Sequence, residues 1–399
     1  MMGAFFGRCA IALLIGSTAA AFGGSGRAAS PDAAGLQGAA EKQPDPLAIG
    51  APAPDFQLPG IDGRTYSLAD FKAHKALVVL FTAVHCPTAE VYEERIKQLV
   101  NDYRAKGVGF VAIQPNNAEA VRLDEMGYTD LGDSLEDMKI RAEHRRFNFP
   151  FLYDGEKQAV SKSYGPVATP HVFVFDQERK LRYHGRVDSN PREAYAKVPD
   201  ARHALDAVLD GKPVPVEKTP AVGCSIKWVG KSSLNAEQAK FAKEPVTLEK
   251  ADAATLKALR ANVTDKTILV NFWATWCAPC TAEIPDLVET WRMYRKRPFD
   301  LVTVSINYPD EEKAVRKFLE SSMAASRNYI SGTMDPYELM RAFDPDWNGG
   351  VPYSMIIAPG GQVIAKFSGP LDILQTRRMI LASFPDDDYV GQNAYWNSK

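Results

Sequence analysis

The first half of the chain alternates short apolar runs with amphipathic stretches. The run at 77–83 (LVVLFTA) predicts a buried central strand. A helical pattern begins after Cys86, and a second apolar run at 108–113 predicts the next strand. Strands that alternate with helices are typical of an α/β fold with a largely parallel centre.

The second half repeats this order. The run at 268–274 (ILVNFWA) predicts a buried strand, Cys277 precedes a helical pattern, and the run at 301–307 predicts the next strand. When the halves are overlaid, Cys86 falls on Cys277, and Thr169-Pro170 and Val351-Pro352 each precede an apolar strand. A repeat of this size predicts two tandem domains of one fold, each a central mixed sheet flanked by helices.

The amino terminus has the pattern of a secretory signal. Arg8 provides a positive start, and a mostly apolar run of 14 residues from Cys9 to Phe22 is followed by small residues. The run is shorter than the roughly 20 residues that span a bilayer. We therefore expect a periplasmic or otherwise exported protein with no stable membrane span after cleavage; a retained N-terminal anchor facing the periplasm is the alternative.

Changes in composition suggest where the domains begin and end. Proline-rich stretches at 30–54 and 213–223 are typical of linkers. The predicted organisation is a signal at 1–29, a linker at 30–46, a first domain at 47–212, a linker carrying Cys224 at 213–243 and a second domain at 244–399.

Charge and cysteine content narrow the functional classes. The 47 basic and 49 acidic residues leave a net charge of -2, which argues against nucleic-acid binding. Five cysteines in 399 residues are too few for a disulfide scaffold. Loss of Cys9 with the signal would leave Cys86, Cys224, Cys277 and Cys280.

The motif Cys277-Ala278-Pro279-Cys280 stands where a buried strand meets a helix. Free N–H groups and the helix dipole at such a place stabilise the thiolate of Cys277. Cys280, one turn further, is placed to attack a mixed disulfide on Cys277, which predicts thiol–disulfide exchange. The alternatives are a structural disulfide and half of a zinc site, but this half has no second CxxC and no histidine.

The stretch FWATWCAPCTAEIP resembles the thioredoxin superfamily, and most of all the exported TlpA/ResA-type thiol:disulfide oxidoreductases, over about residues 244–385. The resemblance implies that Pro352, with Val351, is the cis-proline site that docks a partner chain beside Trp276. It also makes Glu283 a proton acceptor for Cys280; the alternative is a first-turn acid favoured by the helix dipole.

The first half resembles redoxins of the AhpC/TSA-like branch, and in particular peroxiredoxin-like proteins with an HCP motif, over about 47–228. The residues that carry this are IGAPAPDFQLPG, TAVHCPTAEVYEERI, YGPVATPHVFVFD and GCSIKW. Thr169 and Pro170 take the place of the cis-proline pair. True peroxiredoxins have PxxxTxxC, whereas Ala83 and Val79 stand here before Cys86 and Ala89 matches Cys280, so peroxidase activity is doubtful.

Cys86 lies at a helix start, where its thiolate is favoured, and needs a partner if it cycles. His85 adds to this if it is charged; otherwise it points into solvent. Cys224 is the unassigned cysteine, and a reversible Cys86–Cys224 disulfide is our hypothesis. A permanent disulfide, a shared metal site and two independent thiols remain open.

The resulting functional hypothesis is an exported thiol:disulfide oxidoreductase whose CxxC dithiol exchanges disulfides and relays electrons to the Cys86/Cys224 pair. Its expected partners are protein disulfides or dithiols and a membrane electron donor, and its redox groups are its own disulfides rather than a bound cofactor. Alternatives are a thiol peroxidase with a built-in reductant, and a first domain that binds copper or only docks partners.

Overall fold

The computed structural model describes residues 43–230 and 234–385. The predicted signal, Cys9 and most of the first predicted linker lie outside the described residues. Within these ranges no helix combines the length and the apolar character that crossing a membrane requires.

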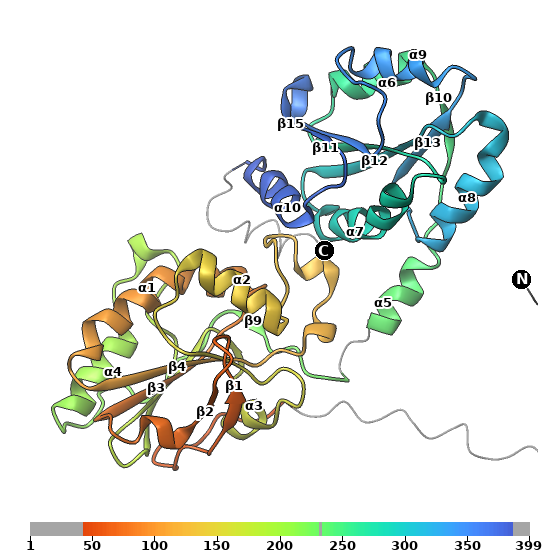
Figure 1. Ribbon diagram of the computed structural model, residues 1–399. Helices are drawn as coiled ribbons and strands as arrows, with labels where there is room; N and C mark the ends of the chain where they lie inside the picture. Colours follow the sequence, from red (N-terminus) through yellow and green to blue (C-terminus); the bar gives the residue numbers. More distant parts are fainter. Residues whose placement is uncertain (1–42, 231–233, 386–399) are drawn as a thin grey trace, which may run out of the picture. The chain divides into compact units, whose positions relative to one another are not determined.

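The first sheet has five strands in the order β5-β4-β3-β7-β8, of which Figure 1 labels β3 and β4. The strand that leads to Cys86 is β3, which pairs in parallel with β4 and antiparallel with β7, so the sheet is mixed. The bounds are β3 (Ala76–Phe81), β4 (Val108–Gln114), β5 (Phe151–Tyr153), β7 (His171–Phe175) and β8 (Leu181–Gly185).

Side-chain alternation along β3 divides the core of this domain into two layers. Val78 and Leu80 face a cluster that includes residues of the helices α1, α2 and α4, whereas Leu77, Val79 and Phe81 face the hairpin β1–β2 and the helix α3. The bounds are α1 (Pro87–Arg104), α2 (Leu135–Arg145), α3 (Ala159–Tyr164), α4 (Asp200–Leu209), β1 (Gln57–Pro59) and β2 (Thr65–Ser67).

The second sheet has six strands in the order β10-β13-β12-β11-β14-β15. Its central strand β11 leads to Cys277 and again pairs in parallel with β12 and antiparallel with β14. The bounds are β10 (Glu249–Ala251), β11 (Thr267–Trp273), β12 (Phe299–Ser305), β13 (Arg327–Ser331), β14 (Tyr353–Ile357) and β15 (Val363–Ser368).

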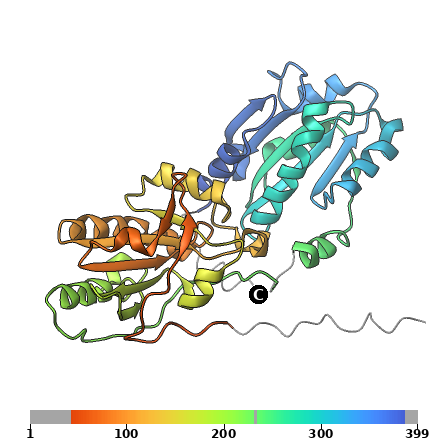
Figure 2. The same cartoon turned by 60° about the horizontal axis from the view of Figure 1, so that its bottom comes forward.

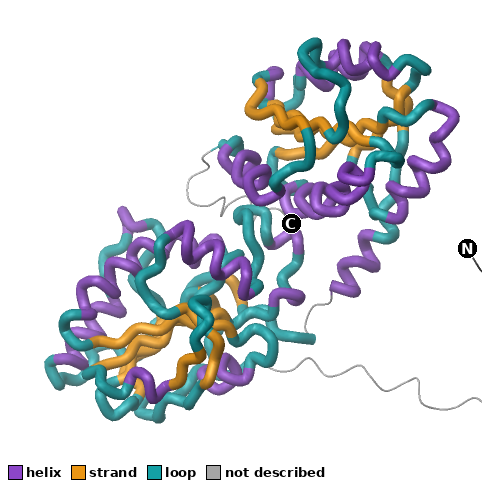
Figure 3. Tube along the Cα trace, in the orientation of Figure 1, coloured by secondary structure: helices purple, strands orange, loops and turns teal. Residues whose placement is uncertain are grey.

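Helices cover both faces of the second sheet (Figures 1 and 2). The helices α7 and α10 lie on one face and α6 and α9 on the other. The bounds are α6 (Ala253–Ala261), α7 (Ala278–Tyr294), α8 (Glu312–Ser321), α9 (Pro336–Phe343) and α10 (Ile373–Ala382). Each domain thus surrounds its strands with helices (Figure 3), and the predicted repeat of one mixed α/β architecture is confirmed.

Part of the segment 213–228 belongs to the first domain, whereas its prolines predicted only a connecting chain. Its strand β9 (Cys224–Ser225) pairs antiparallel with β6 (Ala168–Thr169) of the first domain. Ile226 and Trp228 are 4% and 3% exposed, so burial of these two side chains holds the segment on the domain. Further along, 234–241 forms the helix α5 (Leu234–Phe241).

Candidate functional site

Cys277 and Cys280 form a disulfide at the start of α7. Cys277 is the N-cap residue, and the backbone N–H of Cys280 donates to its sulfur at 3.3 Å. Cys277 is 7% exposed and Cys280 is fully buried, whereas the neighbouring Trp276 is 64% exposed. Cys277 is thus the sulfur nearer to solvent, beside an aromatic ring that is free to contact a partner.

The loop before β14 faces this disulfide. The Val351–Pro352 peptide bond is cis, and the carbonyl oxygen of Val351 lies 3.6 Å from the sulfur of Cys277. Val351 is only half-buried, and docking of an extended partner chain at its backbone stays a prediction.

Glu283 is a buried carboxylate on α7. It accepts hydrogen bonds from the side chain of Asn271 at 2.8 Å and from the backbone N–H of Leu371 at 3.1 Å. Burial raises the pKa of Glu283, although these two hydrogen bonds oppose the rise. A carboxyl with a raised pKa is suited to exchange a proton with a thiol, while the sulfur of Cys280 carries no proton in this disulfide state. Proton acceptance by Glu283 therefore stays a prediction.

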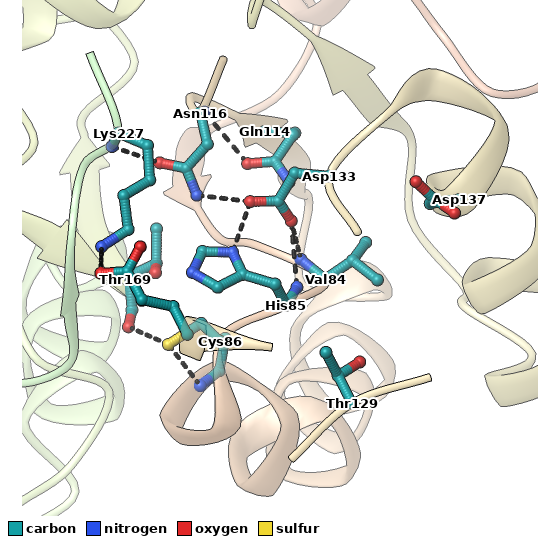
Figure 4. Close-up of polar contacts among 12 residues, drawn as sticks. Val84, His85, Cys86, Gln114, Asn116, Thr129, Asp133, Asp137, Thr169 and Lys227 are labelled. Atoms are coloured by element: carbon teal, nitrogen blue, oxygen red, sulfur yellow. Dashed lines mark hydrogen bonds and ion pairs between the residues drawn. The ribbon is translucent and has the colours of Figure 1, made fainter. Parts of the chain in front are cut away.

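Cys86 occupies the corresponding place in the first domain (Figure 4). It is the N-cap residue of α1, and the backbone N–H of Ala89 donates to its sulfur at 3.4 Å, as Cys280 does to Cys277. The Thr169–Pro170 peptide bond is cis, and the carbonyl oxygen of Thr169 lies 3.2 Å from the sulfur of Cys86. The two domains thus place the same atoms around their first cysteine.

The structure brings Cys224 to Cys86. The pairing of β6 with β9 sets Cys224 opposite Thr169, and the two free thiols share a small buried cluster with Ala83 and Ala89. The two thiols are close enough for each to shift the pKa of the other. Because both are thiols here, their pairing as a reversible disulfide remains a prediction.

His85 lies in a buried ion pair. Its Nδ1 is 2.5 Å from Asp133, and its side chain is 1% exposed, so the solvent-facing alternative is wrong (Figure 4). Asp133 also accepts the backbone N–H groups of Val84 and His85 and the side-chain amide of Asn116. Burial alone would lower the pKa of His85, but the charge and hydrogen bond of Asp133 outweigh it and raise that pKa. Asp133 therefore favours the charged form of the imidazole.

This positive charge acts on Cys86. Burial would raise the pKa of the Cys86 thiol, but the hydrogen bond from Cys224 and the charge of His85 lower it to about 6. The hydrogen bond to Cys86 and burial raise the pKa of Cys224. The pair is therefore asymmetric, and Cys86 is the more acidic of the two thiols.

We predict that the thiolate of Cys86 titrates near pH 6 and that Cys224→Ala raises this pKa, because the variant loses a hydrogen bond to the charged form. Thiolate ultraviolet absorbance against pH measures it, in a Cys277→Ala/Cys280→Ala background that leaves only this pair to titrate in the mature chain. Cys224→Ser keeps a donor and should shift the midpoint less. An unchanged midpoint in Cys224→Ala would contradict the assignment.

Across 43–230 and 234–385, no three His, Cys, Asp or Glu side chains are gathered as a metal ion would need. The shared-metal alternative for Cys86 and Cys224 therefore has no third ligand within those ranges.

Sequence reasoning missed Asp133 and Asn116. Asp133 lies 48 positions from His85 along the chain, and no local motif links them. The signal that could have found Asn116 is its place three residues after the predicted strand at 108–113. The carboxyl ends of parallel strands lie at the edge of the sheet that carries the site.

The family model described as Redoxin matches residues 48–205 and again residues 237–378. The chain therefore belongs to the Redoxin family, with two tandem thioredoxin-like domains.

Relatives with assigned activities resemble one part of the chain. The thiol-disulfide oxidoreductase ResA of Oceanobacillus iheyensis is 27% identical over 134 residues, which cover 31% of this chain and 60% of that protein. The thiol:disulfide interchange protein HelX of Rhodobacter capsulatus is 30% identical over 104 residues, 26% of this chain and 52% of HelX. The matches thus span between half and three fifths of these relatives.

Solved structures also resemble part of the chain. An uncharacterized conserved protein from Geobacillus kaustophilus is 39% identical, with 46% of this chain and 94% of that protein covered and a TM-score of 0.42. A hypothetical protein from Sinorhizobium meliloti 1021 is 35% identical, with 47% and 97% covered and the same TM-score of 0.42.

Proposed function

We propose that this protein is an exported thiol:disulfide oxidoreductase that works through Cys277 and Cys280 and relays electrons to the Cys86/Cys224 pair. The observation that carries the proposal is the Cys277–Cys280 disulfide at the start of α7, with Cys277 facing the carbonyl oxygen of Val351. The likeness to ResA and HelX supports the same chemistry. Its redox groups are its own cysteines, and its partners are proteins that carry a disulfide or a dithiol.

The reduction of a partner proceeds in two exchanges. The Cys277 thiolate attacks one sulfur of the partner disulfide, forms a mixed disulfide and releases the other sulfur as a thiolate. Cys280 gives its proton to Glu283 and attacks Cys277, which closes the Cys277–Cys280 disulfide and releases the second partner sulfur. The partner gains two electrons and the CxxC pair loses two. A membrane electron donor would restore the dithiol by the reverse steps.

A redox titration tests the proposal. The mature full-length chain is equilibrated in glutathione buffers of defined potential, quenched with an alkylating agent and mapped as peptides without reduction. We expect two separate transitions, one for Cys277–Cys280 and one for Cys86–Cys224, and the gap between their potentials gives the direction of the relay. If Cys86 and Cys224 stay unpaired at every potential, the relay is wrong and the second domain alone is the oxidoreductase.

Trapping tests transfer between the two pairs. Cys280→Ala leaves the mixed disulfide on Cys277 without an attacking thiol. A covalent link between Cys277 and a cysteine of the first domain is expected when the Cys86–Cys224 pair is oxidised beforehand. The matched control, Cys277→Ala, should give no such species. Absence of the link in Cys280→Ala would contradict the relay.

A further inference from the structure

We propose that the strand 223–225 is bound in the first domain as a substrate peptide would be, and that Cys224 is the sulfur at which an incoming thiol attacks the Cys86–Cys224 disulfide. Cys86 is then the sulfur that leaves. The inference rests on the proposed exchange at this pair and identifies the sulfur through which it runs.

The strand is held by the residues next to the cis-proline. Cys224 and Ser225 pair antiparallel with Ala168 and Thr169, the two residues directly before cis-Pro170. A peptide that adds a strand to this edge is held by backbone hydrogen bonds and presents one side chain to the site. That side chain is Cys224, and it meets Cys86.

Gly223 shows how closely the strand approaches. A Cβ atom at this position would lie 1.9 Å from the carbonyl oxygen of Thr169, so only glycine fits. The backbone at Gly223 therefore packs directly against the cis-proline loop. In the second domain the same kind of backbone, at Val351, faces Cys277.

The helix α1 carries no resolving thiol. In α7 the sulfur of Cys280 lies one turn behind Cys277 and is bonded to it. In α1 that position is Ala89, whose N–H donates to Cys86 in the same way. No cysteine of α1 is available to attack the sulfur of Cys86. The Cys86–Cys224 disulfide must therefore be opened by a thiol that lies outside α1.

The two sulfurs also differ in their access to solvent. Cys86 is fully buried, whereas Cys224 is 4% exposed and lies between Val222 and Ser225, which are both exposed. An incoming thiol that approaches from this exposed segment therefore meets Cys224 before Cys86. The low pKa of Cys86 acts in the same direction, because the sulfur with the lower pKa leaves faster.

Reduction of the Cys86–Cys224 disulfide takes two thiol–disulfide exchanges. An incoming thiol loses its proton to solvent, and its sulfur bonds to the sulfur of Cys224 while the Cys86–Cys224 bond breaks. The electron pair of that bond stays on Cys86 as a thiolate near the charged His85. A second thiol then attacks the mixed disulfide, and Cys224 leaves with a proton. The pair gains two electrons, and the two incoming thiols become one disulfide.

The test uses glutathione on the mature full-length Cys277→Ala/Cys280→Ala variant, in which the second domain cannot take part. The Cys86–Cys224 disulfide is formed by oxidation, glutathione is added briefly, and N-ethylmaleimide stops the reaction before peptide mapping. We expect glutathione on Cys224 and maleimide on Cys86, in excess over the reverse pattern by about tenfold or more. Glutathione on Cys86, or equally on both, overturns the inference and leaves the proposed pairing intact. If no disulfide forms in the oxidised variant, the proposed pairing itself fails.

A second variant tests how the strand is bound. Gly223→Ala should lift β9 and speed maleimide modification of reduced Cys86 by about tenfold or more, because local opening controls access to a buried thiol. Ser225→Ala, an exposed position on the same strand, is the matched control and should leave the rate unchanged. Equal rates in the two variants would show that the strand does not cover Cys86 and would overturn the inference.

Discussion

Replacing Cys277 with alanine is expected to abolish disulfide exchange by the second domain. Cys277 is the less buried sulfur of the pair and faces the Val351 carbonyl, so a partner disulfide meets it first. Loss of the attacking group in a covalent mechanism lowers the rate on the order of a thousandfold or more. The measurement is the reduction rate of a small disulfide substrate by the reduced mature chain.

Cys86→Ala is the matched control for this prediction. It removes a cysteine at the same position of the repeated fold but leaves the CxxC pair in place, so reduction of the small substrate should continue. If Cys277→Ala kept the original rate and Cys86→Ala lost it, exchange would run through the first domain, and the proposed roles of the two domains would be reversed.

Asp133→Asn is expected to destabilise the first domain strongly and to raise the pKa of Cys86. Asp133 is the buried partner of His85 and accepts three further hydrogen bonds. Breaking a buried ion pair by removing one partner costs about 3–5 kcal/mol. Without the carboxylate the imidazole loses its charge, and the thiolate of Cys86 loses the nearby positive group. Chemical denaturation and thiolate absorbance measure the two effects.

Asp137→Asn is the matched control for this effect. Asp137 is half-buried near the start of α2 and bonds Ser134 in a capping box, so its loss should cost only about 1 kcal/mol. Equal destabilisation by the two variants would show that the His85–Asp133 ion pair does not account for the loss of stability in Asp133→Asn.

The stabilisation from this pair also depends on pH in a defined direction. The pKa of Asp133 is lowered because the charge and hydrogen bond of His85 outweigh the effect of burial, so its contribution is present above about pH 4 and is lost as the pH falls through the lowered value. The pKa of His85 is raised, so its contribution is complete below about pH 6.5 and is lost as the pH rises through the raised value. The stability difference between the original chain and Asp133→Asn should therefore be largest between these limits.

The sequence by itself determined the repeated fold and the position of the CxxC site. Apolar runs long enough for buried strands, each followed by a cysteine and a helical pattern, predict two mixed α/β domains. The position of Cys277 at a strand-to-helix junction follows from the same local pattern, because a helix start is defined by neighbouring residues.

The tertiary structure alone decided which groups surround Cys86. The charge state of His85 depends on Asp133, and the docking of Cys224 depends on Thr169, which lies 83 positions from Cys86. These contacts join segments that are distant along the chain, and a charged group is buried only where its partner is also present. Local patterns determine the elements of this protein, but the pairing of buried charges and of the added strand β9 is fixed by how those elements pack.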